Sequence, residues 1–81
     1  MTDRLDYRAI GSRVRELRLR HKMTQEYLAE LVDISPSFIG HIERGEKKPS
    51  LETMSRITMV LETSMDYLIL GIKNRCKLRG L

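Results

Sequence analysis

The residues of this chain that could take part in catalysis or metal binding are few and widely spaced. Two histidines and one cysteine lie at His21, His41 and Cys76. Zinc sites use such ligands at close, regular spacings, and no serine, histidine and carboxylate form a plausible nucleophilic set. We therefore expect no enzyme, no metal and no cofactor. A single cysteine excludes an internal disulfide and is typical of a reducing, cytoplasmic compartment.

Contact with DNA is a chemistry that one segment fits better. A helix beginning near residue 35 would carry on its outer face Ser35, Ser37, Phe38, Gly40 and His41. A narrow helix with short side chains on its exposed face can enter the DNA major groove, which is about 12 Å wide. The segment therefore predicts a helix that reads duplex DNA.

The first turn of this helix differs from the other expected helix starts. Thr24, Ser50 and Ser64 are each followed two residues later by an acid, whereas no acid follows Ser35 until Glu43. A carboxylate at a helix N-terminus would repel phosphate, and its absence leaves the positive end of the helix dipole available. This difference favours a phosphate-rich partner.

Helical periodicity predicts the elements that must position this face, and no segment alternates as a strand would. Thr24, Ser35, Ser50 and Ser64 are expected N-terminal caps, and Gly45 and Gly71 suit helix ends. The first helix is expected at about 7–21. The apolar stripes are, in chain order, Ile10, Val14 and Leu17; Leu28, Leu31 and Val32; Ile39 and Ile42; Met54, Ile57 and Leu61; and Met65, Leu68 and Ile69. The sequence thus predicts a compact, all-α fold of five helices.

The joint between the second and third helices is very short. Only Asp33 and Ile34 precede the cap Ser35, so the two helices must meet at a steep angle, with Ile34 inside. Ala29 is small at the point where they would approach most closely. Residues 25–44 are therefore expected to form a helix-turn-helix.

Two charged residues fall beside buried stripes. Arg18 lies four residues after Val14, and Glu43 lies four residues after Ile39. A charge on the core side is costly unless it is paired, and these two charges have opposite signs. We expect an Arg18–Glu43 ion pair that locks the first helix to the end of the third.

The net charge of +4 comes from one end of the chain. Residues 72–81 hold Lys73, Arg75, Lys77 and Arg79 and no acid; removing these four from the fifteen basic residues leaves eleven, equal to the eleven acidic residues. We expect a helix-turn-helix domain at 1–71 and a short basic tail at 72–81, with neither a secretory signal nor a membrane span. The tail is either a solvated end or a weak DNA-binding arm.

The combined pattern resembles the phage repressor/Cro type of helix-turn-helix transcriptional regulator. The resemblance rests on residues 23–45 (MTQEYLAELVDISPSFIGHIERG), 48–51 (KPSL) and 64–68 (SMDYL), and it covers about 10–71. It implies that Gln25 anchors a phosphate and that Pro36, Ser37 and His41 face base edges, with Ser35 at the start of the helix. It further implies backbone contacts by Arg44 and by Lys47 or Lys48, and an internal pair of Arg18 with Glu43.

Three departures from the family pattern concern the turn and the reading face. Asp33 stands where glycine is common in the turn, and it tolerates a left-handed backbone better than most residues, so we expect the turn to form. Pro36 has no N–H and can offer only van der Waals contact, for example to a thymine methyl. Gly40 lowers helix propensity in the middle of the third helix, which we interpret as room for close approach to the sugar-phosphate backbone.

These expectations define a sequence-specific regulator that binds duplex DNA with helix 35–44. One short helix contacts few base pairs, so we expect a homodimer on a pseudo-palindromic operator. Tyr67, Leu70 and Ile72 form the expected interface, unless the tail folds back over them. From a length of 81 residues we expect no separate effector-binding domain. The alternative is a protein-interaction module, such as the antitoxin of a toxin–antitoxin pair, and phage-like or restriction–modification regulators of this type are equally compatible.

Overall fold

The computed structural model describes residues 5–72, and they form five helices and no strand. The α-helices are α1 (Tyr7–Arg20), α2 (Gln25–Val32), α3 (Pro36–Glu43) and α4 (Leu51–Val60), and a short π-helix, η1, spans Asp66–Leu70. The all-helical prediction is confirmed. The expected tail at 72–81 lies, apart from Ile72, outside the described residues.

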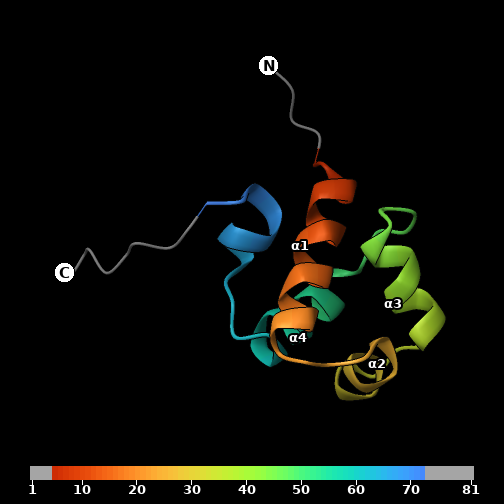
Figure 1. The fold of residues 1–81 in the computed structure, drawn as a ribbon. Helices are drawn as coiled ribbons and strands as arrows, with labels where there is room; N and C mark the ends of the chain where they lie inside the picture. Colours follow the sequence, from red (N-terminus) through yellow and green to blue (C-terminus); the bar gives the residue numbers. More distant parts are fainter. Residues whose placement is uncertain (1–4, 73–81) are drawn as a thin grey trace.

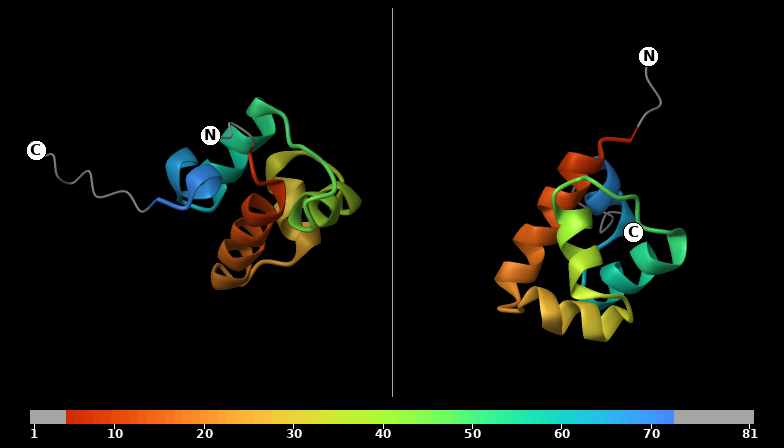
Figure 2. Two further views of the ribbon diagram at one scale, coloured as in Figure 1. Left: turned by 90° about the horizontal axis from the view of Figure 1, so that it is seen from above. Right: turned by 90° about the vertical axis from the view of Figure 1, so that its right-hand side faces the viewer.

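Helix α1 is central to the arrangement (Figure 1). Helices α2 and α3 lie on one side of it, η1 lies on the other, and α4 crosses behind. The main packing contacts join α2 to α3, α1 to α3, α1 to η1 and α2 to α4. In the right-hand view of Figure 2, α3 faces the viewer, and the loop that follows it leaves from its C-terminal end. The fold therefore leaves one long side of α3 uncovered.

The core is aliphatic, as the composition predicts. Its fully buried side chains come from all five helices and include Ile10, Val14, Leu28, Val32, Ile39, Ile42, Ile57, Leu61 and Leu68. One expectation is wrong: Leu31 is 43% exposed and is not part of the inward stripe of α2. Helix α2 is only eight residues long, so its core contact is made by Leu28, Ala29 and Val32 alone.

The predicted helix caps are present. The hydroxyls of Thr24, Ser35, Ser50 and Ser64 accept hydrogen bonds from the backbone N–H three residues ahead, at 3.0–3.1 Å. Asp33 adopts the left-handed conformation (φ 64°) at the end of α2, as expected for the turn. These local contacts satisfy backbone donors that the first turn of a helix leaves free.

Gly11 lies at a close approach of α1 to α3, a contact that was not predicted from the sequence. A Cβ atom at this position would lie 2.1 Å from the carbonyl oxygen of Ile42 and 2.7 Å from that of Glu43. Neither backbone oxygen can move without displacing α3. The absence of a side chain at Gly11 therefore sets how closely the end of α3 approaches α1.

We predict that Gly11→Ala lowers the free energy of unfolding by about 1–3 kcal/mol, because the methyl group must push two helices apart. Gly40→Ala is the matched control, since a Cβ there would meet only the flexible side chains of Arg44 and Gln25, at 3.3 and 3.7 Å. It should be neutral or stabilising by up to about 1 kcal/mol through helix propensity. Urea unfolding measures both, and equal effects of the two substitutions would contradict this account of Gly11.

Candidate nucleic-acid interface

The first turn of α3 presents short polar side chains to solvent. Ser35 is the N-terminal cap, and its Oγ accepts a hydrogen bond from the N–H of Phe38 at 3.1 Å. Pro36 and Ser37 follow in the first turn, and all three residues are exposed. No acidic residue lies in this turn, so the positive end of the helix dipole is uncompensated there.

The other end of α3 is held by a buried ion pair. The Arg18 guanidinium donates from Nε to Glu43 Oε2 at 2.6 Å and from Nη2 to Glu43 Oε1 at 3.2 Å. Both residues are only 7% exposed. This two-point geometry fixes direction as well as distance. The structure thus brings together the two residues that the sequence pairs.

The same ion pair reaches the start of α2. Arg18 also donates from Nη1 to the carbonyl oxygen of Met23 at 2.8 Å, just before the cap Thr24. Gln25, the first residue of α2, donates from Nε2 to Glu43 Oε1 at 3.0 Å. Three elements, α1, α2 and α3, therefore meet at the single carboxylate of Glu43. Gln25 is half-buried and is positioned beside α3 by this bond.

Gly40 does not lie on the open face of α3, which corrects an expectation from the sequence. It is buried, with the Gln25 and Arg44 side chains over it. The absence of a side chain at Gly40 therefore leaves room for these two polar side chains. They cover the position to which we expected a sugar-phosphate backbone to come close.

His41, Arg44 and Glu46 form a polar cluster at the exposed end of α3. Glu46 Oε1 lies 2.8 Å from His41 Nδ1, and Glu46 Oε2 accepts from Arg44 Nε at 3.2 Å. Hydrogen bonds from His41 and then Arg44 lower the pKa of Glu46 below its usual value. The carboxylate is therefore ionised at neutral pH, and two of the expected DNA-contacting residues carry an acidic partner.

Lys47 and Lys48 are exposed in the loop between α3 and α4. The Lys48 ammonium lies 5.6 Å from the centre of the Tyr7 ring, at the start of α1. Such a cation–π contact is weak at an exposed site. The lysine therefore lies beside the start of α1 with its charge in solvent.

Glu46 is the residue of this site that the sequence analysis missed. It follows Gly45, the glycine expected at the end of this helix, which adopts the left-handed conformation (φ 77°). That reversal brings residue 46 back over the last turn, where its N–H donates to the carbonyl oxygen of His41 at 2.8 Å. A glycine-ended helix followed at once by an acid was the available signal.

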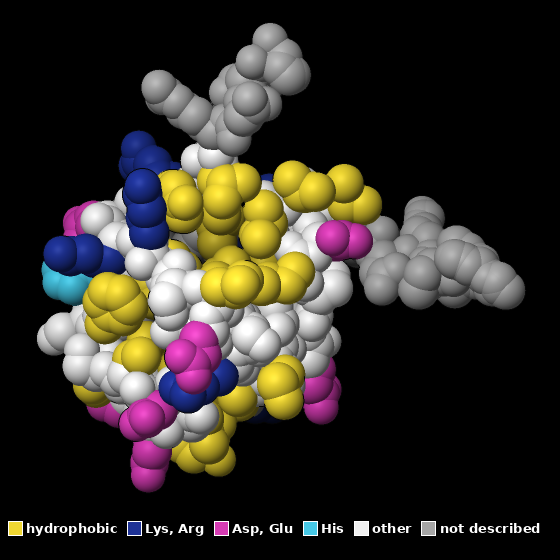
Figure 3. Space-filling model, turned by 180° about the vertical axis from the view of Figure 1, so that it is seen from behind, with side chains coloured by type: hydrophobic (Ala, Val, Ile, Leu, Met, Phe, Trp, Pro, Cys, Tyr) yellow, Lys and Arg dark blue, Asp and Glu magenta, His cyan; other side chains and the backbone are white. Residues whose placement is uncertain are grey.

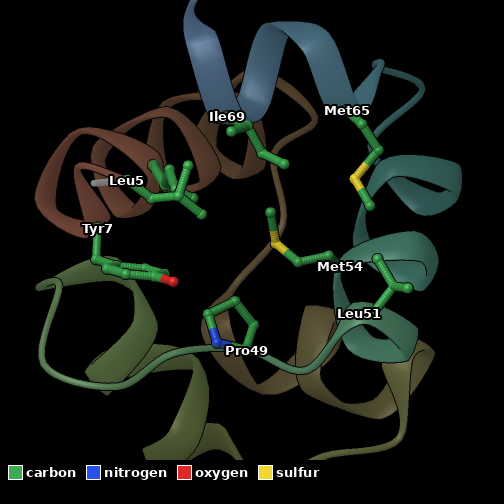
Figure 4. A pocket seen from close by; sticks show the side chains of 8 residues that line it. Leu5, Tyr7, Pro49, Leu51, Met54, Met65 and Ile69 are labelled. Carbon is green, nitrogen blue, oxygen red and sulfur yellow. The ribbon is translucent and has the colours of Figure 1, made fainter. Parts of the chain in front are cut away.

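An apolar surface lies on another face of the molecule. Figure 3 shows hydrophobic side chains gathered on the side away from the viewer of Figure 1, with histidine and basic side chains at its edge. A groove of about 180 Å³ opens there, between the start of α1, the start of α4 and η1 (Figure 4). The side chains that line the groove point toward one another. They belong to Leu5, Tyr7, Pro49, Leu51, Met54, Met65 and Ile69.

Of the three residues expected at a dimer interface, Tyr67 and Leu70 belong to η1, and Ile72 follows shortly after it. Leu70 and Ile72 are 59% and 56% exposed, and Tyr67 is half-buried. Arg13 of α1 fixes this end of η1 by donating to the carbonyl oxygens of Leu68 and Ile69 at 2.9 and 3.3 Å. The exposed apolar side chains therefore stand on a segment that is tied to the core.

Within residues 5–72, no group of three or more potential metal ligands is gathered at one place. None of the helices in this range is both long and apolar enough to span a bilayer.

Comparison with known proteins identifies the family. The model of the Helix-turn-helix family matches residues 14–68. The chain therefore belongs to this family of DNA-binding transcriptional regulators, in agreement with the resemblance to phage repressors seen in the sequence. The match contains the ion pair, both helices of the motif and most of η1.

Individual relatives agree with this assignment. An uncharacterised HTH-type transcriptional regulator of Bacillus subtilis, YobD, is 42% identical over 60 residues, which are 74% of this chain and 53% of YobD. The restriction-modification controller protein C.AhdI from Aeromonas hydrophila superposes with a TM-score of 0.74 at 33% identity, over 79% of this chain and 97% of that one. The P22 c2 repressor, crystallised with a synthetic operator, superposes with a TM-score of 0.75 at 33% identity, over 78% of this chain and 96% of that one. The chain spans about half or less of the length of the first curated relatives.

We predict that Glu43→Leu lowers the free energy of unfolding by about 3 kcal/mol or more, because it leaves the buried Arg18 charge unpaired. Arg18→Met combined with Glu43→Leu should cost much less. A double-mutant cycle by urea unfolding measures the coupling. The exposed pair Arg20–Glu16, at 3.1 Å, is the matched control and should couple by about 0.5 kcal/mol or less. Equal coupling in the two pairs would contradict a structural role for the buried one.

Proposed function

We propose that this chain binds duplex DNA sequence-specifically by inserting the outer face of α3 into the major groove. The observation that carries the proposal is the combination of an uncovered polar face on α3 with a buried ion pair that holds the helix by its other side. In this arrangement Ser37 and His41 lie near base edges, Pro36 contacts apolar base surface, and Ser35 stands at the entrance of the groove. No catalytic step is assigned to the chain.

Phosphate contacts are expected to flank this face. The side chains of Gln25, at the start of α2, and Arg44, at the end of α3, both lie over Gly40, and Lys47 and Lys48 follow in the exposed loop. Such contacts fix the register of a protein on the duplex without reading its sequence. The P22 c2 repressor, which shares this fold, was crystallised with an operator, and this supports the docking mode proposed here.

The proposed regulator acts as a homodimer on a pseudo-palindromic operator in the cytoplasm. A two-fold dimer places two recognition helices about 34 Å apart, matching one turn of DNA. The exposed Leu70 and Ile72, with Tyr67, offer an apolar surface, and an isologous interface pairs such a surface with the same surface of a second copy. Residues 1–71 act as the DNA-binding unit.

We predict that selection from a random duplex library with the purified chain enriches a defined motif. His41→Ala should relax the preference at one or two base pairs, at a cost of about 1–3 kcal/mol on the preferred sequence. Lys48→Ala should instead weaken binding to all sequences and reduce its salt dependence. Gln25→Ala should also weaken binding to all sequences, but it should leave the salt dependence unchanged because the glutamine side chain carries no charge. An unenriched library would exclude sequence-specific recognition by this chain.

We further predict that the wild type is a weak dimer whose association tightens on a palindromic site. Leu70→Asp should shift the free chain to monomer, because it places a charge in an apolar interface. Leu19→Asp, at a 50% exposed position on α1, is the control and should leave the association unchanged. Analytical centrifugation with and without DNA measures this, and equal behaviour of all three proteins would reject the interface.

A further inference from the structure

The contact between His41 and Glu46 determines where the imidazole carries its proton. Glu46 Oε1 lies 2.8 Å from His41 Nδ1, and an ionised carboxylate can only accept hydrogen bonds. The lowered pKa of Glu46 keeps it ionised. In neutral His41, Nδ1 must therefore carry the hydrogen and donate it to Glu46.

A second group approaches the same nitrogen. Arg44 Nη2 lies 3.3 Å from His41 Nδ1, but an arginine only donates, so it cannot bond to a nitrogen that already carries hydrogen. The carboxylate contact prevails because it is shorter and charge-assisted. Arg44 instead donates from Nε to the other carboxylate oxygen of Glu46, Oε2, at 3.2 Å.

We propose that Glu46 is a specificity-determining positioning residue, which fixes the tautomer of His41 so that its Nε2 presents an unprotonated lone pair to DNA. The proposal rests on the proposed function, in which His41 faces the major groove. Among the described residues, no side chain or carbonyl hydrogen-bonds Nε2. The atom offered to a base is therefore an acceptor.

An acceptor at this position selects among bases. In the major groove adenine offers its N6 amino group and cytosine its N4 amino group, whereas guanine O6 and N7 and thymine O4 only accept. His41 in this tautomer therefore favours adenine or cytosine and disfavours guanine or thymine on the strand that it contacts. This preference for adenine or cytosine is set by Glu46, because a histidine alone could adopt either tautomer.

Glu46→Gln is expected to reverse the base preference at the position that His41 contacts. Arg44 can only donate, so it takes the single amide oxygen of the new side chain. The amide NH2 then faces His41 Nδ1, which must become the acceptor, and the hydrogen moves to Nε2. The variant should therefore favour guanine or thymine at the position where the wild type favours adenine or cytosine.

Library selection with the full chain tests the reversed base preference. It is carried out at about pH 8.5, above the pH range in which histidine side chains ordinarily lose their proton. We expect Glu46→Gln to change the preferred base at one position, with the former base now about fivefold to tenfold weaker, the worth of one hydrogen bond. Glu16→Gln is the matched control, because it also removes an exposed acid paired with an arginine. Both variants share any general gain in DNA affinity, but the control should keep the wild-type motif.

A second variant and a spectroscopic readout complete the test. Glu46→Ala leaves Arg44 as the donor to Nδ1, so it should change the base preference in the same direction. The ¹⁵N chemical shifts of the His41 ring distinguish protonated from unprotonated nitrogens. In the free protein, the protonated nitrogen should be Nδ1 in the wild type and Nε2 in Glu46→Gln. An unchanged motif in both Glu46 variants, with the wild type selecting a clear site, overturns the proposal. Absence of any wild-type motif overturns the proposed function and this inference with it, whatever the ring shifts.

Discussion

The buried pair of Arg18 and Glu43 is the interaction on which the rest of this structure depends. Its carboxylate accepts hydrogen bonds from α1 through Arg18 and from the start of α2 through Gln25, while Glu43 itself ends α3. Replacing such a pair with apolar residues need not cost stability. Its value here is directional, because charge-assisted, two-point bonds fix how α3 is turned relative to α1 and α2.

A steric constraint acts together with this electrostatic one. Gly11 allows α1 to touch the backbone of α3 at Ile42 and Glu43, so the carboxylate of Glu43 can reach Arg18. Apolar packing of Ile39 and Ile42 alone would permit several rotations of so short a helix. Close backbone contact and the ion pair select one, and that rotation turns Ser37 and His41 outward.

Features that depend on local spacing were predictable from the sequence. The caps at Thr24 and Ser35 and the left-handed turn at Asp33 involve neighbours within four residues, so residue type and position suffice. Opposite charges beside two buried stripes likewise indicated Arg18 with Glu43. The burial of Gly40 and the contact of Gly11 depend on which side chains other helices bring over them, and periodicity carries no such information. Glu46 required knowledge of the path of the chain after Gly45.

Helix α3 is held by its inner side, which leaves its outer side free to meet DNA in the proposed function. The most direct measurement is the ¹⁵N–¹H NMR spectrum of the full chain during titration with a short duplex. The largest shifts should fall on residues 35–41, on Gln25 and on the loop 44–48, with the Nε–H signal of Arg18 unchanged because the buried pair stays intact. Shifts concentrated on η1 and the apolar groove, with α3 unaffected, would contradict the account.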